Sequence, residues 1–285
     1  MRFAFAGFDL WCGVFDAFVA EGWEPLALFT MPVDNQHDFN QEVVTRAQSH
    51  RIPVQMSPIC AEDLLTLRER QCDALVVAGH GWRIPDWTRA MPYAVNFHPS
   101  PLPEGRGPYP LFRAILEGRR DWAVSCHRVS PDFDAGNILA SDPVALAHDE
   151  CHETLQLKLQ LATRRLATHV ARDFRALWDS SRPQTGGSYW PKTTDADRTL
   201  DFSAPVADIL RVARACGQHE CIAPIGALSL YVRHAAGWEE RHNHPPGSIV
   251  HRYRHNLVVA AHDGFIALLD WSALPRPART TLNGL

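Results

Sequence analysis

The sequence predicts an α/β protein: a Rossmann-like domain with a mostly parallel sheet, followed by a small β-rich domain. Three observations lead to this prediction. Short apolar runs alternate with amphipathic stretches over the first half of the chain, as they do in βαβ units. A long amphipathic helix and a polar segment follow, and the last third of the chain consists of short β-rich runs separated by turn residues.

The apolar runs of the first half have the length and composition of buried strands. We expect strands at residues 3–7, 26–30, 74–78, 94–97, 122–129 and 138–146, of which the last two add an antiparallel component. Turn residues bound the amphipathic stretches between them. We expect helices there at residues 10–21, 39–49, 60–70 and 86–91.

One long helix is expected at residues 151–179, because apolar residues recur there at three- and four-residue intervals. The predicted domains are a catalytic domain at 1–182, a linker at 183–199 and a small barrel-like, OB-like domain at 200–285. The last domain has an expected helix at 205–215, β-rich runs at 228–233, 248–253, 257–261 and 265–271, and a polar tail at 280–285 expected to be disordered.

Composition and charge exclude several classes of protein. The chain has 285 residues, 28 basic and 32 acidic side chains and a formal net charge of −4, which excludes a basic nucleic-acid-binding module. Its 46% hydrophobic residues are ordinary for a globular protein. No apolar stretch approaches the roughly 20 residues that a membrane helix needs, and no signal peptide is visible, so we expect a cytoplasmic protein without membrane contact.

The cysteines and histidines do not indicate a metal site. Seven scattered cysteines without a C-x-x-C pair favour reduced thiols. His242 and His244 invite a metal interpretation, but they stand beside two prolines and a glycine, where a surface loop is the better explanation. We therefore expect no metal.

The first βα turn, residues 7–13, lacks the G-x-G-x-x-G spacing of a dinucleotide site. The informative stretch begins at a predicted strand end, where ligands bind in open α/β sheets. It reads Asn96-Phe-His98-Pro-Ser100-Pro-Leu102-Pro103-Glu-Gly105-Arg106-Gly107. Asn96 and His98 are two residues apart on a strand, so they point to the same side at a separation of about 6.5 Å.

A second polar loop follows His127 and contains Asp132, Asp134 and Gly136. An amide, a histidine and an acid around one point suit acyl transfer without a covalent intermediate. Asn96 and His98 can stabilise an oxyanion, while Asp134 sets the charge of the histidine and handles the proton. No G-x-S-x-G nucleophile motif is present.

The pattern Asn-x-His-Pro-Ser-x-Leu-Pro-x-x-Arg-Gly, followed by His-x6-Asp-x-Gly, resembles the folate-dependent formyltransferases, which include methionyl-tRNA and sugar N-formyltransferases. The resemblance is clear over residues 1–182 and weaker over 187–271. It implies 10-formyltetrahydrofolate as cosubstrate, the catalytic trio Asn96, His98 and Asp134, and direct attack of an amine on the formyl carbon through a tetrahedral intermediate. Protonated His98 would hold the oxyanion together with Asn96.

The resemblance also implies a folate pocket and supporting residues. The pocket would be lined by Gly81, Trp82, Arg83, Ile84, Leu102, Pro103, Asp132 and Phe133. The substrate-binding or supporting residues would be Ser100, Arg106, Gly107, His127 and Gly136.

Several roles stay open at this point. Asp134 is preferred to Asp132 as the acid because the glycine two residues later matches the family pattern. Arg106 is as suited to binding an anionic substrate group as to capping a helix near residue 110, and His127 is as suited to supporting the site as to acting in it. Trp82 would stack on the aminobenzoate ring or serve as an apolar anchor.

The expected acceptor is the amine of a small molecule, such as an amino-sugar nucleotide or an amino or hydroxylamino acid. The segment at residues 31–42 is acidic and has no Lys or Arg, which disfavours tRNA as a partner. Arginines at 164, 165, 172 and 175 are the counter-argument, and a solvated helix face is their preferred interpretation. The alternatives are a methionyl-tRNA formyltransferase, a formyltetrahydrofolate hydrolase and a non-catalytic folate-binding protein. A homodimer is left open.

Overall fold

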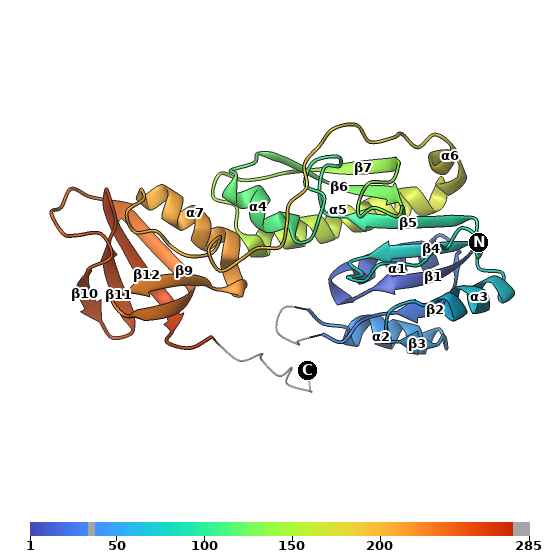
Figure 1. Ribbon diagram of the computed structural model, residues 1–285, viewed down its shortest axis with the longest axis horizontal. Coiled ribbons are helices and arrows are strands. Elements are labelled where there is room, and N and C mark those ends of the chain that lie inside the picture. Colours follow the sequence, from blue (N-terminus) through green and yellow to red (C-terminus); the bar gives the residue numbers. More distant parts are fainter. Residues whose placement is uncertain (34–37, 276–285) are drawn as a thin grey trace.

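The computed structural model describes residues 1–33 and 38–275 (Figure 1). Residues 34–37, in the middle of the acidic segment, and the predicted polar tail at 280–285 lie outside the described residues. The described chain forms two parts, each built on its own sheet, and a long irregular segment joins them.

Seven strands form the sheet of the first part, in the order β3-β2-β1-β4-β5-β6-β7. They are β1 (Arg2–Gly7), β2 (Glu24–Phe29), β3 (Val54–Gln55), β4 (Ala74–Ala78), β5 (Tyr93–His98), β6 (Asp121–Arg128) and β7 (Ile138–Ala145). Strands β1 to β5 are parallel, whereas β6 and β7 pair antiparallel. The predicted Rossmann-like domain with a mostly parallel sheet is confirmed.

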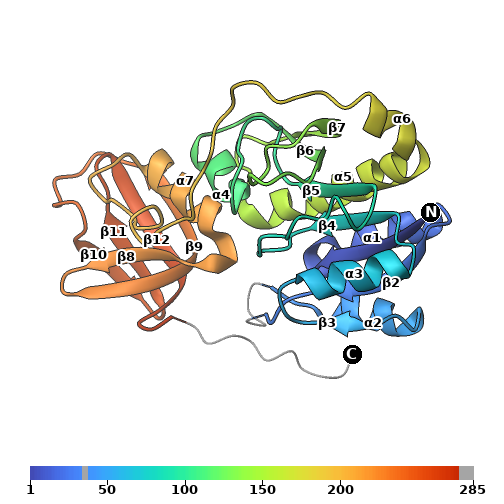
Figure 2. The ribbon, with the colours of Figure 1, turned by 45° about the vertical axis from the view of Figure 1, so that its right-hand side comes forward.

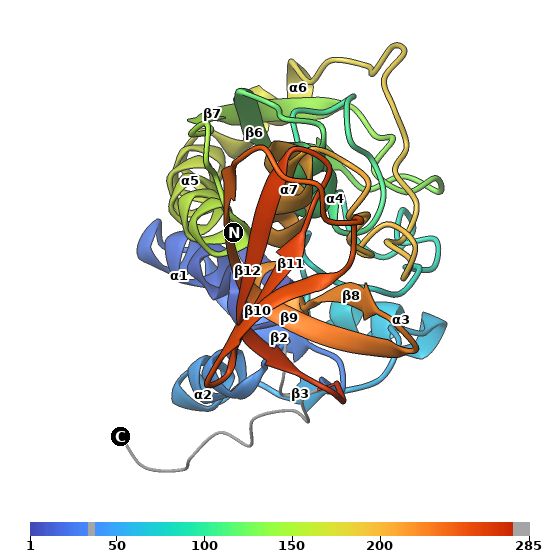
Figure 3. The same cartoon turned by 90° about the vertical axis from the view of Figure 1, so that its left-hand side faces the viewer.

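The central strand β1 shows how the sequence sorts the two faces of this sheet. Phe3 and Phe5 point to one face, where they join the core beneath α1 and α5. Ala4 and Ala6 point to the other face and lie in the core beneath α3. Figure 3 shows these helices on opposite sides of the sheet. The helices of the first part are η1 (Asp9–Trp11), α1 (Cys12–Ala20), α2 (Gln41–Ser49), α3 (Ala61–Glu69), α4 (Pro110–Leu116), α5 (His152–Arg172) and α6 (Phe174–Asp179).

The prediction of a helix at residues 86–91 is wrong. The segment forms a turn in which the carboxylate of Asp86 accepts the backbone N–H of Thr88 at 3.0 Å and its hydroxyl at 2.6 Å. Pro85 and Pro92 bound it on both sides. Six residues between prolines are too few to propagate a helix, and Pro92 disfavours helical geometry at the residue before it.

The helix expected at residues 151–179 is two helices, because the chain leaves helical geometry at Asp173. The side chain of Asp173 lies 3.2 Å from that of His169, and the backbone N–H of Asp173 donates to the carbonyl of His169 at 3.1 Å. The break lets Phe174 pack against Trp23 at 5.0 Å and Tyr93 at 5.1 Å between ring centroids. Aromatic packing at this corner therefore redirects the chain.

The second part contains α7 (Val206–Cys216), η2 (Gly217–His219) and a five-stranded antiparallel sheet in the order β10-β11-β12-β9-β8. Its strands are β8 (Cys221–Ile225), β9 (Leu228–Glu239), β10 (Ile249–Tyr253), β11 (Asn256–Ala260) and β12 (Gly264–Ser272). The predicted β-rich domain is confirmed. Strand β8 was not expected. Within the described residues β10 is a free edge, whereas the outer side of β8 pairs with residues 198–200, and no hydrogen bonds between β10 and β8 close the sheet into a barrel.

The connection between the two parts runs from α6 across the first part to α7 (Figure 2). We call residues 182–190, at its beginning, the strap. The strap pairs with the first part through the bridges Ile138–Arg182 and Arg106–Tyr189, and Trp190 stacks on Trp122 at 5.5 Å. It is thus bonded to the loop that follows β5. None of the helices described here is both long enough and apolar enough to span a membrane.

Candidate active site

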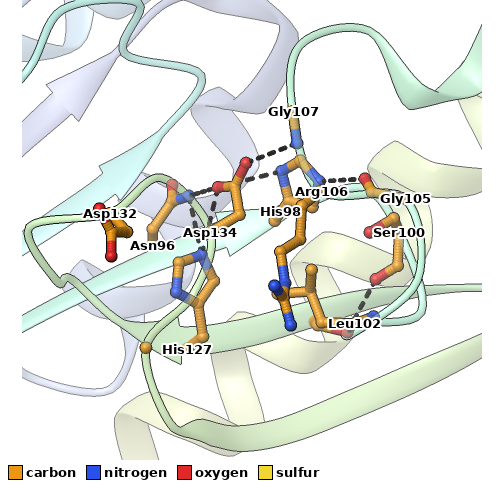
Figure 4. A network of polar contacts seen from close by, with 12 residues as sticks. Asn96, His98, Ser100, Leu102, Gly105, Arg106, Gly107, His127, Asp132 and Asp134 are labelled. Carbon is orange, nitrogen blue, oxygen red and sulfur yellow. Dashed lines mark hydrogen bonds and ion pairs between the residues drawn. The ribbon is translucent and has the colours of Figure 1, made fainter. Parts of the chain in front are cut away.

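Strand β5 carries Asn96 and His98 to its carboxyl end, where both side chains lie on one face of the sheet (Figure 4). The antiparallel register with β6 places His127 directly opposite Asn96. Directly opposed residues point to the same face of a sheet, so the two histidines and the amide gather there. The pairing of β5 with β6 therefore brings Asn96, His98 and His127 together.

Asp134 is the centre of this cluster. One carboxylate oxygen, Oδ1, lies 3.3 Å from Asn96 Nδ2 and 3.5 Å from both His98 Nδ1 and His127 Nε2. The other, Oδ2, accepts the backbone N–H of Gly107 at 2.9 Å. Figure 4 shows the carboxylate between these partners. The structure thus brings Asn96, His98 and Asp134 together, while Asp132 is exposed and takes no part in these contacts.

Two glycines permit this close approach of loops. A Cβ atom at Gly136 would lie 1.9 Å from the carbonyl oxygen of Arg128, so no side chain fits there. Gly107 has φ of +102°, and a Cβ atom would lie 2.3 Å from the carbonyl oxygen of Trp190. Asp134 itself adopts φ of +55°, a conformation that Asp tolerates better than most residues. The family pattern Asp-x-Gly therefore has a steric cause here.

Charge and hydrogen positions in the cluster follow from burial and neighbours. Burial favours the neutral form of Asp134, but the facing histidines and the Gly107 N–H outweigh it and hold the pKa of this carboxyl below its usual range. Burial lowers the pKa of His98, and the carboxylate of Asp134 opposes this only in part. His98 Nε2 lies 2.9 Å from the carbonyl of Gly105 and must donate to it, which leaves Nδ1 facing Asp134.

His127 orients Asn96. Its Nδ1 lies 2.8 Å from the backbone carbonyl of Arg128 and must donate to it, so in the neutral ring Nε2 is the acceptor. Asn96 Nδ2 lies 3.1 Å from that Nε2 and 3.3 Å from Asp134, so both amide hydrogens have partners. His127 is only 2% exposed, and these contacts favour the supporting role over direct participation.

A cleft opens beside the cluster, between the loops that follow β4 and β6. Its lining comprises Val77, His80, Trp82, Arg83, Ile84, Asn96, His127, Val129, Ser130, Pro131, Asp132, Phe133 and Asp134. Five of the expected pocket residues are among these. The two walls touch where the Arg83 guanidinium donates to the carbonyl of Pro131 at 2.7 Å and lies 5.2 Å from the ring centre of Phe133.

Three expected pocket residues do not line this cleft. Gly81 has no side chain to contribute. Leu102 is 7% exposed, and its N–H donates to the hydroxyl of Ser125. Pro103 accepts the backbone N–H of Ser188 in the strap. Ser100 is fully buried and donates to the carbonyl of Glu104 at 2.7 Å, so its contacts shape the loop.

His80 was missed by the sequence analysis. It follows β4 at the same edge of the sheet and lines the cleft, and both of its ring nitrogens are buried without a hydrogen-bond partner. Burial lowers the pKa of His80 to about 4. The only sequence signal was its place at a strand end, because an isolated histidine carries no motif.

The low pKa of His80 predicts a loss of stability in acid. The unfolded chain binds the proton near pH 6.5 and the folded chain near pH 4, so this stabilisation is complete above pH 6.5 and is lost as the pH falls toward 4. Between pH 7 and pH 5, urea unfolding of wild type should lose about 2 kcal/mol more than unfolding of His80→Phe. The exposed control His251→Phe should keep the wild-type dependence. Equal pH slopes for His80→Phe and wild type would contradict this assignment.

Arg106 does not cap helix α4, and its bonds in this structure go to the strap, while binding of an anionic substrate group stays a prediction. Its Nε donates to Gln184 Oε1 at 3.0 Å and its Nη2 to the carbonyl of Gly186 at 2.8 Å. Both partners belong to the strap. The residue before helix α4 is Tyr109, so Arg106 does not cap that helix.

Gln184 ties the strap to the site and was also missed. Its Nε2 donates to the backbone carbonyls of Asp134 at 2.7 Å and of Gly136 at 2.8 Å, while its Oε1 holds Arg106. One amide therefore bonds both loops that carry the cluster. No sequence pattern links it to Asp134, because the two residues are brought together only by the tertiary fold.

Replacing Gln184 with alanine should reduce turnover by up to roughly 100-fold, because small displacements of a catalytic group have such effects. Gln184→Glu keeps the acceptor for Arg106 but loses both donors, so we expect a similar loss. Steady-state kinetics should show the change in kcat rather than in KM for folate. The exposed control Gln48→Ala should behave as wild type. Unchanged kcat in both Gln184 variants would show that the strap does not position Asp134.

In residues 1–33 and 38–275, no three His, Cys, Asp or Glu side chains are grouped so as to hold a metal ion. His242 and His244 pack against Phe265, with 4.5 Å between the first ring and the phenyl ring. His242 Nε2 donates to the carbonyl of Gly264 at 2.9 Å, and its Nδ1 accepts the N–H of His244 at 3.1 Å. Both nitrogens of His242 thus have protein partners.

Comparison with known proteins gives two family matches. The family model "Formyl transferase" matches residues 36–170, and "Formyl transferase, C-terminal domain" matches residues 192–280. A methionyl-tRNA formyltransferase from Chromobacterium violaceum is 28% identical over 203 residues, which cover 70% of this chain and 66% of that protein.

Solved structures share the fold at lower identity. HypX from Aquifex aeolicus superposes with a TM-score of 0.68 and 16% identity over 98% of this chain, which spans only 46% of HypX. An N-formyltransferase from Helicobacter canadensis, solved with folinic acid and dTDP-3-aminofucose, has a TM-score of 0.70 and 13% identity over 95% of this chain and 100% of its own.

The two family models match successive parts of the chain: the first spans β3 to β7 of the first sheet, and the second spans the whole second sheet. The structural neighbours superpose on nearly the whole chain. The chain belongs to the formyl transferase family.

Proposed function

We propose that this protein is an N-formyltransferase that uses 10-formyltetrahydrofolate and delivers the formyl group to the amine of a small molecule. The observation that carries the proposal is the convergence of Asn96 and His98 on one carboxylate oxygen of Asp134, beside an open cleft. An amide, an imidazole and an ionised acid at one point are suited to acyl transfer.

The cleft fits a folate. Its lining offers aromatic and apolar surface at Trp82, Ile84 and Phe133 and the unpartnered imidazole of His80, as a heterocycle with donors and acceptors requires. Two structural neighbours support the same ligand class, since they were solved with folinic acid and with tetrahydrofolic acid. When bound, the folate supplies the formyl group.

His98 and Asp134 have different tasks in the proposed reaction: one accepts a proton and the other stabilises the resulting charge. His98 is neutral in the resting site, and its Nδ1 is the nitrogen left free to take the proton of the attacking amine. The same nitrogen would return the proton to N10 of the folate as the bond between N10 and the formyl carbon breaks, so that tetrahydrofolate can leave. The ionised Asp134, 3.5 Å away, stabilises the imidazolium formed by the first of these transfers. This differs from the protonated His98 expected from the resemblance, because burial lowers its pKa.

Asn96 is proposed to stabilise the negative charge that develops on the formyl oxygen. In the resting site both of its amide hydrogens are bonded inside the cluster, so one bond must be exchanged for the bond to the incoming oxygen. The bond to Asp134 is the longer one, at 3.3 Å. Its exchange costs less than loss of the bond to the buried His127.

A small acceptor is favoured over tRNA by the charges along α5. Of its arginines, Arg165 pairs with Asp142 at 3.0 Å, and Arg172 pairs with Glu21 at 2.9 Å. Arginines that are already neutralised add little affinity for a phosphate backbone. The net charge of −4 has the same consequence.

Methionyl-tRNA is the second candidate acceptor, because the relatives found by sequence are methionyl-tRNA formyltransferases at 26–29% identity. A hydrolase would use the same three residues with water as acceptor. A folate-binding protein without activity would not require the precise cluster around Asp134.

The test is tetrahydrofolate release from 10-formyltetrahydrofolate, followed by absorbance. The protein is offered pooled nucleotide amino sugars, then amino and hydroxylamino acids, and separately charged initiator tRNA. Release with one small-molecule pool supports the proposal, whereas release only with charged tRNA identifies the second candidate. Release without an acceptor indicates a hydrolase, and tight folate binding without release in any pool contradicts a transferase acting on these acceptors.

A further inference from the structure

A cavity of about 350 Å³ is lined by residues from both parts of the molecule, and none of them belongs to the catalytic cluster. Two loops of the first part and helix α7 of the second form its walls. The lining residues are Ile115, Gly118, Arg119, Arg120, Leu146, Ala147, His148, Glu150, Ala207, Leu210, Arg211 and Arg214. None of them lines the cleft beside Asp134, so this is a separate site.

Cations face this cavity from both walls. Arg211 and Arg214 are three residues apart on α7 and therefore share one face of the helix. Arg119 and Arg120 come from the loop between α4 and β6. Like charges brought together across a boundary between two domains repel one another unless an anion lies between them.

Carboxylates within the chain neutralise only part of this charge. Arg119 pairs with Glu117 at 2.9 Å, and Arg211 pairs with Asp208 at 3.0 Å. Glu150, the only acid in the lining, is engaged by Lys158, Thr154 and the N–H of Ala147.

Two arginines of the lining are compensated weakly or not at all by close acids, since Asp149 acts on Arg214 only from beyond ion-pair distance. Over the described part of the chain, neither Arg120 nor Arg214 forms an ion pair, and Nε of Arg214 is buried without any hydrogen-bond partner. Buried polar atoms nearly always have partners, so an orphaned guanidinium nitrogen in a cavity wall indicates a missing acceptor.

We propose that this cavity binds a small molecule that carries phosphate. Guanidinium groups bind phosphate oxygens in pairs, and Arg120 and Arg214 approach from opposite walls. Ile115, Leu146 and Leu210 supply an apolar surface for the remainder of the ligand. A pocket of about 350 Å³ has the size of a small-molecule site, whereas a nucleic-acid backbone requires a continuous basic surface. The ligand would thereby bridge the two domains.

The test is calorimetric titration of the full-length protein with inorganic pyrophosphate and with ADP. We expect both to bind, ADP more tightly because of the apolar surface. Arg120→Gln and Arg214→Gln should each weaken binding at least tenfold, and Arg175→Gln, an exposed arginine of α6, should not. Folinic acid should not displace either probe, because it would occupy the other cleft.

Three results would overturn the proposal. They are absence of binding by both probes, equal binding by wild type and both cavity variants, and displacement of the probes by folinic acid. Binding of tRNA that depends on Arg120, without binding of pyrophosphate, would assign the surface to nucleic acid instead. Circular dichroism and thermal unfolding of each variant establish that it is folded before titration. None of these readouts depends on formyl transfer.

Discussion

Asp134→Asn is expected to lower formyl transfer by roughly 100- to 10,000-fold, the range for loss of a general acid–base group. Asparagine has nearly the same shape and can still accept the N–H of Gly107, but it removes the negative charge that faces both histidines. Single-turnover kinetics with saturating folate measure the effect. Asp132→Asn, which changes the exposed acid of the same loop, is the matched comparison; because Asp132 lines the cleft, its effect should appear in folate affinity, and activity at saturating folate should be retained. The reverse outcome would make Asp132 the acid.

The same variant changes the pH dependence. The proposed reaction needs neutral His98, so wild-type activity falls when the pH drops through the lowered pKa of His98, below its ordinary value of 6.5. The carboxylate of Asp134 raises that pKa, so its removal moves the fall to still lower pH. A residual activity whose acid limb stays where it is in wild type would argue against the coupling of these two groups.

Asn96→Ala is expected to reduce turnover by roughly 100- to 1,000-fold, as loss of one oxyanion donor does in other enzymes. Folate affinity should change little, because the amide acts on charge that develops only during the reaction. Stopped-flow formyl transfer and equilibrium folate binding separate the two effects. Asn256→Ala, at an exposed position of the second sheet, provides the matched control.

His98→Ala tests the partner of this amide. If the two groups act as a unit, the double variant Asn96→Ala, His98→Ala should lose far less than the product of the two single losses. Near-normal formyl transfer by His98→Ala would disprove the proposed role of the imidazole.

The predictable features were those that depend on local pattern. Buried apolar runs located the main strands, and alternation along β5 put Asn96 and His98 on one face. The helix expected at 86–91 does not form because only six residues separate Pro85 from Pro92. Strand β8 escaped notice because it is short and contains Pro224. Local pattern predicts strands most clearly where both faces of the sheet are buried.

The unpredicted features depend on tertiary contacts. Gln184 acquires its function only when the strap crosses the loop that contains Asp134, 50 positions earlier in the chain. His80 becomes distinctive only by being buried without a partner. The contacts of Arg106 with the strap were not anticipated for the same reason, since its partners lie about 80 residues away. Side chains that support a site from a distant segment leave no spacing to recognise.

The strap also has a consequence for synthesis of the protein on the ribosome. The complete seven-stranded sheet ends at Ala145, yet Gln184, Gly186 and Ser188 bond the catalytic loops only afterwards. A nascent chain that stops at residue 182 would contain the whole sheet and the trio but lack the bonds that hold Asp134 and Arg106. A synthetic peptide spanning the strap, added in trans, would be the natural means of restoring these bonds.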